Sequence, residues 1–173
     1  AAKKLLAEAG YGPHKPLKME IRYNTSENHK NTAAAIHEQL KPIGVEVTLL
    51  NTDTKTHYGH LEQHGDFDIA RAGWIADYKD PENFLALCKS GTGNNHGEYA
   101  NPEHDDLLAK AAAATDAGER MKLLSQAEAI GVARDLCVVP LLYYSYHNLV
   151  SDKVKGFEEN VMDVHPTRYL SKE

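Results

Sequence analysis

The first third of the chain switches between strand-like and helix-like patterns of apolar residues. Strict alternation of apolar and polar positions, which indicates half-buried strands, occurs at residues 17–23 and 45–49. Between them, residues 27–40 carry apolar side chains at helical spacing and follow a threonine and a serine that can cap a helix. A more polar helix is predicted at residues 54–64, and a short apolar strand at residues 67–72. This order of elements predicts a parallel sheet with right-handed crossovers.

Other patterns flank this predicted sheet. A short amphipathic helix is predicted at residues 1–9, where a glycine ends it. A loop rich in glycine and asparagine, residues 90–97, precedes two helices that begin at Asn101 and Asp116. A proline follows Asn101 and a glutamate lies three residues after Asp116, and both are typical signals of a helix start. The apolar run at residues 137–142 contains a proline, so it predicts an edge or bulged strand, which tyrosines extend.

Length, charge and hydropathy exclude several classes of protein. The 173 residues suit a single domain, and a net charge of −6 without a run of basic residues argues against a nucleic-acid partner. No apolar stretch approaches the ~20 residues of a membrane span, so we expect no direct membrane insertion. The chain shows no secretion signal and begins without methionine inside an amphipathic pattern, which indicates a mature or excised product.

The most informative stretch is residues 65–84, GDFDIARAGWIADYKDPENF. Its apolar strand breaks at a glycine, and the only tryptophan, Trp74, and the carboxylate of Asp77 follow within four residues. Ligands of open α/β sheets bind in the crevice beyond the carboxyl ends of the strands, so this stretch is a candidate binding site. Two structural roles stay open: Asp77 can satisfy backbone amides in the turn before Pro81, and Trp74 can anchor a core.

The same stretch resembles the corresponding segment of the periplasmic oligopeptide-binding proteins, the substrate-binding components of peptide ABC importers. The resemblance is most specific in FDIARAGWIADYKDPENFL and continues through AKKLLAEAGY, KPLKMEIRYNTSENHK, IGVEVTLLN and VVPLLYYSYHNLV. Members of that family are much longer and close a peptide between two lobes. The resemblance therefore implies that residues 1–173 are a single lobe of a type II periplasmic-binding-protein-like α/β fold, with a parallel βαβαβ sheet, later helices and a returning C-terminal strand.

The resemblance also implies roles for three residues of this stretch. The family holds the α-amino group of the peptide at the position of Asp77, and charge-assisted hydrogen bonds suit that contact. At Trp74 the family has an aromatic ring beside a roomy side-chain pocket. Arg71 matches an arginine that meets the carboxylate of peptides of certain lengths. From the residues alone, a buried arginine also needs a partner within the chain, such as Asp66 or Asp68.

Three more residues match the family's peptide-facing positions less closely. Tyr143 and Tyr144 fall where the family has a run of tyrosines facing the peptide, although the first member of that run is Leu142 here. Their alternative role is a half-buried strand with hydroxyls in water. His64 lies one residue from the place of a histidine that can meet a peptide carboxylate.

A histidine row offers an alternative function of another class. His57, His60 and His64 would share one face of the predicted helix, and imidazoles in such a row can bind zinc or nickel. The helix is polar and therefore predicted to be solvated, and no cysteine or carboxylate completes a tetrahedral set nearby. Cys88 and Cys137 are consistent with buried thiols or with one disulfide that closes a 49-residue loop.

The residues and the resemblance together predict a binding protein. No nucleophile elbow, metalloprotease motif, phosphate-binding loop or cysteine–histidine pair is present, so we expect neither an enzyme nor a cofactor. The predicted function is to bind short extended peptides for ABC-transporter uptake. The expected partners are short peptides, a missing N-terminal lobe of the same protein and the membrane subunits of the importer. The expected location is the periplasm, or the cell surface as a lipoprotein in a bacterium without an outer membrane.

Overall fold

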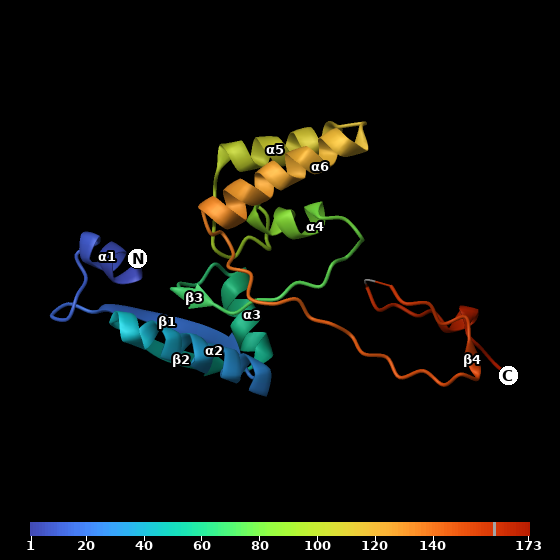
Figure 1. Ribbon diagram of the computed structural model, residues 1–173, viewed down its shortest axis with the longest axis horizontal. Helices are drawn as coiled ribbons and strands as arrows, with labels where there is room; N and C mark the ends of the chain where they lie inside the picture. The colour runs from blue at the N-terminus through green and yellow to red at the C-terminus, as the bar shows by residue number, and fades with distance from the viewer. Residues whose placement is uncertain (161) are drawn as a thin grey trace. The chain divides into compact units, whose positions relative to one another are not determined.

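The computed structural model describes residues 1–160 and 162–173, and the chain forms two compact units. The first unit is Ala1–Gly73 and the second is Trp74–Glu173. Figure 1 traces the chain through the sheet of the first unit and the helices of the second. Within the described ranges, no helix is both long enough and apolar enough to cross a membrane.

The first unit is built on a three-stranded parallel sheet with strand order β2-β1-β3 (Figure 1). β1 (Leu17–Asn24) pairs with β2 (Val45–Thr52) over its whole length. On its other side, β1 pairs with β3 (Ile69–Ala70), which is much shorter than the strand predicted at residues 67–72. The parallel βαβαβ sheet that the sequence predicts is confirmed.

α2 (Glu27–Leu40) covers one face of this sheet. Its Ala33 packs against Ile21 and Tyr23 of β1 in a buried cluster, and partly buried residues of the neighbouring strands extend that cluster. Gly44 then begins the path into β2 at φ +88°, a conformation that glycine adopts without steric cost. Two short helices complete the first unit: α1 (Ala2–Glu8) and η1 (Lys41–Ile43).

α3 (Thr54–Glu62) covers the other face of β1. The carboxylate of Asp53 caps the helix by accepting a backbone N–H of the first turn at 3.0 Å. Successive residues of a strand point to opposite faces, so Arg22 and Asn24, both buried, lie on the face opposite Ile21. The sequence predicts a solvated helix here, but His57 of α3 is fully buried, which corrects that prediction.

The second unit has a small helical core. α5 (Pro102–Ala113) and α6 (Ala117–Glu128) form a helical hairpin (Figure 1). Both predicted caps are confirmed, because the side chains of Asn101 and Asp116 accept backbone N–H groups of the first turns at 2.9 and 2.8 Å. The buried apolar cluster is Leu85, Leu108, Ala111, Leu124 and Ala127. The other helical segments are α4 (Glu82–Leu85), η2 (Ala86–Cys88), the π-helical η3 (Ala129–Arg134) and η4 (Thr167–Tyr169).

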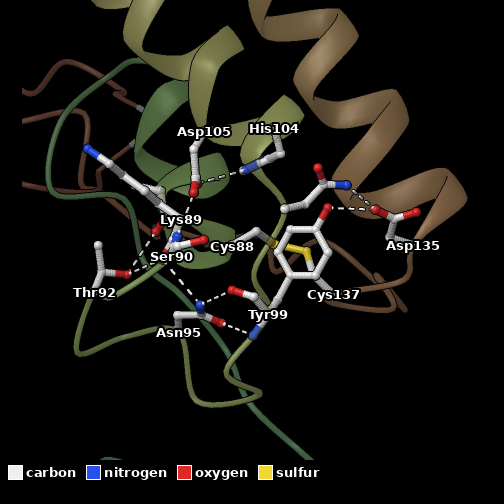
Figure 2. The surroundings of a disulfide bond; sticks show 12 residues. Cys88, Lys89, Ser90, Thr92, Asn95, Tyr99, His104, Asp105, Asp135 and Cys137 are labelled. Atoms are coloured by element: carbon white, nitrogen blue, oxygen red, sulfur yellow. Dashed lines mark hydrogen bonds and ion pairs between the residues drawn. A yellow bond between two sulfur atoms is a disulfide. The ribbon is translucent and has the colours of Figure 1, made fainter.

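A disulfide bond joins Cys88, at the end of η2, to Cys137, which follows η3 (Figure 2). The two Cα atoms are 6.0 Å apart, although 49 residues separate the cysteines in the sequence. This bond resolves the alternative that the sequence leaves open. It fixes the chain after the helical hairpin to the segment that precedes the hairpin.

Polar side chains hold the predicted loop beside this disulfide (Figure 2). The buried side chain of Asn95 donates to the carbonyl oxygens of Lys89 and Tyr99 at 3.2 and 2.7 Å, and it accepts the N–H of Tyr99. The carboxylate of Asp135 accepts hydrogen bonds from the Tyr99 hydroxyl and the Asn101 amide, both at 2.7 Å. The hydrogen bond from Arg134 has the largest effect on Asp135 and holds the pKa of its carboxyl group well below the usual range. The bonds from Tyr99 and Asn101 lower that pKa further. The loop is therefore ordered by hydrogen bonds rather than by apolar packing.

The chain after Cys137 does not form the predicted strand. Residues 139–151 form no regular secondary structure, and no strand of the described chain pairs with them. Apolar side chains there are solvent-exposed, with Tyr143 95% exposed. An extended segment becomes a strand only beside a partner edge, and β4 (Val154–Lys155) and β5 (Ser171–Lys172) pair with each other. The prediction of a strand at residues 137–146 is therefore wrong for this chain by itself.

Candidate functional site

A buried amide organises the stretch around Trp74 and Asp77. The indole Nε1–H of Trp74 donates to Oδ1 of Asn83 at 2.8 Å, and the backbone N–H of Asp77 donates to the same oxygen at 3.0 Å. The Asn83 amide also donates to Oδ2 of Asp77 at 3.5 Å. Asn83 is buried at the start of α4, so it fixes the ring, the backbone and the carboxylate together. The structure thus brings two of the predicted site residues, Trp74 and Asp77, to one place.

The carboxylate of Asp77 is solvent-exposed. Among the described residues it accepts the Asn83 bond and makes no ion pair. The nearby carboxylate of Asp80 does accept a backbone amide: its Oδ1 accepts the N–H of Glu82, the first residue of α4, at 2.9 Å. The backbone amide at the start of α4 is therefore bound by Asp80 rather than by Asp77.

Asp80 is itself fixed by a two-pronged ion pair with α6. Both terminal nitrogens of Arg120 donate to its carboxylate, at 2.7 and 2.9 Å. This arrangement lowers the pKa of Asp80, chiefly through the hydrogen bonds from Arg120. The Arg120–Asp80 pair therefore anchors the turn between Asp77 and Asn83 to the helical hairpin.

Arg71 lies in the first unit, where β1 and α3 hold it. Its backbone N–H donates to the carbonyl of Arg22 at 2.8 Å, and its Nη1 donates to the hydroxyl of Tyr58 at 3.2 Å. Of the two aspartates proposed as internal partners, Asp68 accepts the backbone N–H of Glu20 at 2.7 Å. The structure therefore adds a hydroxyl partner for Arg71 that the sequence did not suggest.

The histidine row does not form a metal site. Nε2 of His57 contacts the carbonyl oxygen of Arg71 at 2.8 Å, and Nε2 of His60 contacts that of Asp66 at 2.9 Å. His64 lies beyond the end of α3, with φ +52°, so it does not continue the helical row. No group of three possible ligands converges within the part of the chain that the structure describes. The metal-binding alternative therefore finds no support in the described residues.

Tyr143 and Tyr144 lie in the irregular segment at residues 139–151 of the second unit. Tyr143 is almost fully exposed and Tyr144 is also exposed. Within the second unit, Trp74 and Asp77 share Asn83 as a partner and the two tyrosines are exposed. Within the first unit, Arg71 contacts Tyr58 and His64 follows α3. Sequence reasoning missed Asn83 and Tyr58, because the pattern of apolar and polar positions gives no signal for their side-chain hydrogen bonds.

Acid is expected to destabilise the fold through two buried histidines. Burial lowers the pKa of His57, and the positive charges of Arg22 and Arg71 lower it further. Burial also lowers the pKa of His104, although the nearby carboxylate of Asp105 acts in the opposite direction. In the unfolded chain both groups titrate near 6.5, so the unfolded state binds more protons between that pH and the lower folded pKa. The free energy of unfolding should hold steady from pH 8 to 7 and fall from pH 6.5 to 5.

Urea unfolding followed by fluorescence across this pH range measures the effect. Replacing His104 with Gln, which does not titrate, should flatten part of the decline below pH 6.5. A stability that rises as the pH falls from 6.5 to 5 would contradict the buried, neutral state of these imidazoles.

The comparisons with known proteins place the chain in a family. Residues 1–96 match the family described as bacterial extracellular solute-binding proteins, family 5 Middle. The chain belongs to this family of solute-binding proteins. It is 42% identical to the periplasmic oligopeptide-binding protein OppA of Escherichia coli over 90% of its length, and 43% identical to OppA of Haemophilus influenzae over 89%.

Solved structures agree with this assignment. The E. coli murein tripeptide-binding protein MppA matches 98% of the chain with a TM-score of 0.87 and 36% identity. H. influenzae OppA in complex with the peptide RPPGFSPFR matches 98% with a TM-score of 0.83 and 39% identity. The chain covers 33% and 34% of those two structures, and 28% and 29% of the two OppA sequences. The predicted type II periplasmic-binding-protein-like fold is thereby confirmed, and these relatives are named as binding proteins rather than as enzymes.

Proposed function

We propose that this chain binds short oligopeptides in extended form for uptake by an ABC transporter, as one half of a two-lobed cleft. The observation that carries the proposal is the exposed carboxylate of Asp77, which Asn83 fixes beside the ring of Trp74. A carboxylate held in this way is matched to the α-ammonium group that every unblocked peptide carries. The names of the OppA and MppA relatives, and the OppA complex with a peptide, support the same ligand class.

The fixed position of Asp77 lowers the entropic cost of binding an ammonium group. The backbone of Asp77 is tied to Asn83 and the following turn is tied to α6 through Asp80, so little conformational freedom is lost when an ammonium binds. Ile75 and Phe84 expose apolar side chains near this carboxylate in the sequence. They and Trp74 offer apolar contact without demanding one side-chain shape, which suits a binder of varied peptides.

The remaining predicted residues are assigned to the rest of the ligand. We propose that Arg71 meets the carboxylate of peptides of certain lengths and that His64 contributes near the same end. Tyr143 and Tyr144 would contact the peptide backbone through their hydroxyls, as an extended ligand requires many polar partners. None of these roles involves catalysis or a cofactor.

The partners and location follow from the same proposal. We propose that residues 1–173 belong to one lobe, that a second lobe of the same protein closes over the peptide, and that importer subunits receive it. The exposed apolar segment 138–150 is the surface we assign to contact with the second lobe, because such a stretch is costly to leave in water. The relatives' names support a periplasmic location, and the disulfide is stable in that oxidising compartment.

Calorimetric titration with a mixed library of tri- to pentapeptides tests the proposal. The chain alone should bind at roughly millimolar affinity or weaker, because Asp77 then pairs with the ligand in water, where an exposed ion pair contributes about 0.2–1 kcal/mol. The same titration with the second lobe present should show much tighter binding. Absence of binding in the two-lobed protein would refute the function, and micromolar binding by the chain alone would refute the half-cleft.

A further inference from the structure

Two consecutive residues of α3 hold Arg71 at both its backbone and its side chain. The ring Nε2 of His57 lies 2.8 Å from the carbonyl oxygen of Arg71, and the hydroxyl of Tyr58 lies 3.2 Å from Nη1 of its guanidinium. The backbone N–H of Arg71 is bound by the carbonyl of Arg22 in β1. Arg71 is therefore fixed to a strand on one side and to a helix on the other.

The hydrogen bond between His57 and the backbone of Arg71 has a defined direction. A carbonyl oxygen only accepts, so Nε2 of His57 carries the hydrogen and donates it to Arg71. The imidazole is fully buried, and it meets the ring of Tyr58 edge to face with the ring centres 5.1 Å apart. His57 and Tyr58 are consecutive residues of α3, so one helix supplies the contact to the backbone of Arg71 and the contact to its guanidinium.

The absence of a side chain at Gly73 leaves space for the Arg71 guanidinium. A Cβ atom at residue 73 would lie 3.1 Å from Nη2 of Arg71, which is tighter than most Cβ contacts, so the guanidinium would have to shift. A side chain at residue 73 would therefore press on the guanidinium, whereas the glycine leaves it room beside the hydroxyl of Tyr58.

We propose that His57 and Tyr58 are positioning residues that orient the Arg71 guanidinium toward the carboxylate of a peptide, and so set the preference for a free C-terminus. The inference rests on the proposed function and deepens it. An arginine side chain loses much rotational freedom when it binds, and a side chain already held by a hydroxyl loses less. Arg71 contacts the ligand in this scheme, whereas His57 and Tyr58 act through Arg71.

The first test compares peptides of two to five residues that carry free or amidated C-termini, titrated into the two-lobed protein. The parent protein should prefer the free form at one length, and Arg71→Gln should remove that preference. Tyr58→Phe, which deletes only the hydroxyl, should reduce the preference about 3- to 10-fold by weakening free peptides while amidated peptides bind as before. Tyr11→Phe, on a tyrosine outside this contact, is the matched control and should change nothing.

Variants of His57 separate positioning from packing. Gln carries an N–H at nearly the reach of Nε2, so His57→Gln should keep most of the preference, whereas His57→Leu should lose it. Gly73→Ala should lower the preference as well, because its methyl group displaces the guanidinium.

A second readout needs no peptide. Nitrogen-15 relaxation of the Arg71 side chain should show an ordered guanidinium in the parent and a more mobile one in Tyr58→Phe. Unchanged mobility, or an unchanged preference in Tyr58→Phe while Arg71→Gln abolishes it, would overturn the positioning role and leave the proposed function standing. A parent protein that binds free and amidated peptides equally at every length would overturn the Arg71 contact and this inference with it, while binding itself would still support the function.

Discussion

Removing the disulfide is expected to lower the free energy of unfolding of the second unit by about 4 kcal/mol. The bond between Cys88 and Cys137 closes a loop of 49 residues, and in the chain-entropy account a closed loop of that length restricts the unfolded state by this amount. The loop contains the whole α5–α6 hairpin, so the unfolded chain gains much freedom when the bond is lost. The double substitution of both cysteines with Ala avoids placing a new polar group at the buried Cys88 position.

Urea unfolding followed by the fluorescence of Trp74 measures this effect, because the only tryptophan lies in the second unit. The parent protein in a reducing agent should approach the stability of the double variant, and the same reagent should not alter the variant. A loss below about 1 kcal/mol in both comparisons would show that the disulfide does not restrict the unfolded state.

Replacing Asp77 with Asn is expected to weaken peptide binding by the two-lobed protein by about 2–5 kcal/mol, or roughly 30- to 4,000-fold in Kd. The substitution keeps the shape and the bond with Asn83, so folding should be preserved, but it leaves the ligand ammonium without a charged partner in the closed cleft. Calorimetry with one unblocked tripeptide gives the loss directly.

Asp106→Asn is the matched control, because that exposed carboxylate of α5 forms an ion pair with Lys110 on the same helix. It should leave the peptide affinity unchanged. If Asp77→Asn binds the tripeptide as tightly as the parent does, the α-amino group is held elsewhere.

Local patterns predicted the sheet and the helix starts, because those features depend on neighbouring residues. The alternation in β1 and β2 and the caps at Asn101 and Asp116 are properties of short windows, and the structure contains all of them. The same windows failed at residues 137–146, which read as a strand. Pairing depends on a partner edge, and none exists for this segment in the described chain.

The features that the sequence did not reveal are side-chain hydrogen bonds and a cross-link outside regular helix or strand spacing. His57 looks like a surface residue of a polar helix, and only the carbonyl of Arg71, 14 residues away, explains its burial. Asn83 gives no sign that it binds both Trp74 and Asp77, and the two cysteines meet only because the α5–α6 hairpin turns the chain back. Tertiary hydrogen bonds and cross-links of this kind leave no periodic trace in the sequence.

The most direct test of the account is a titration of the two-lobed protein with one tripeptide in free and N-acetylated forms. Acetylation removes the positive charge that Asp77 is proposed to bind and adds bulk at the same place. We expect the acetylated peptide to bind at least about 30-fold more weakly than the free one, the lower end of the range for a buried charge pair that loses one partner. Equal affinities for the two forms would contradict the role of Asp77 on which the proposed function depends.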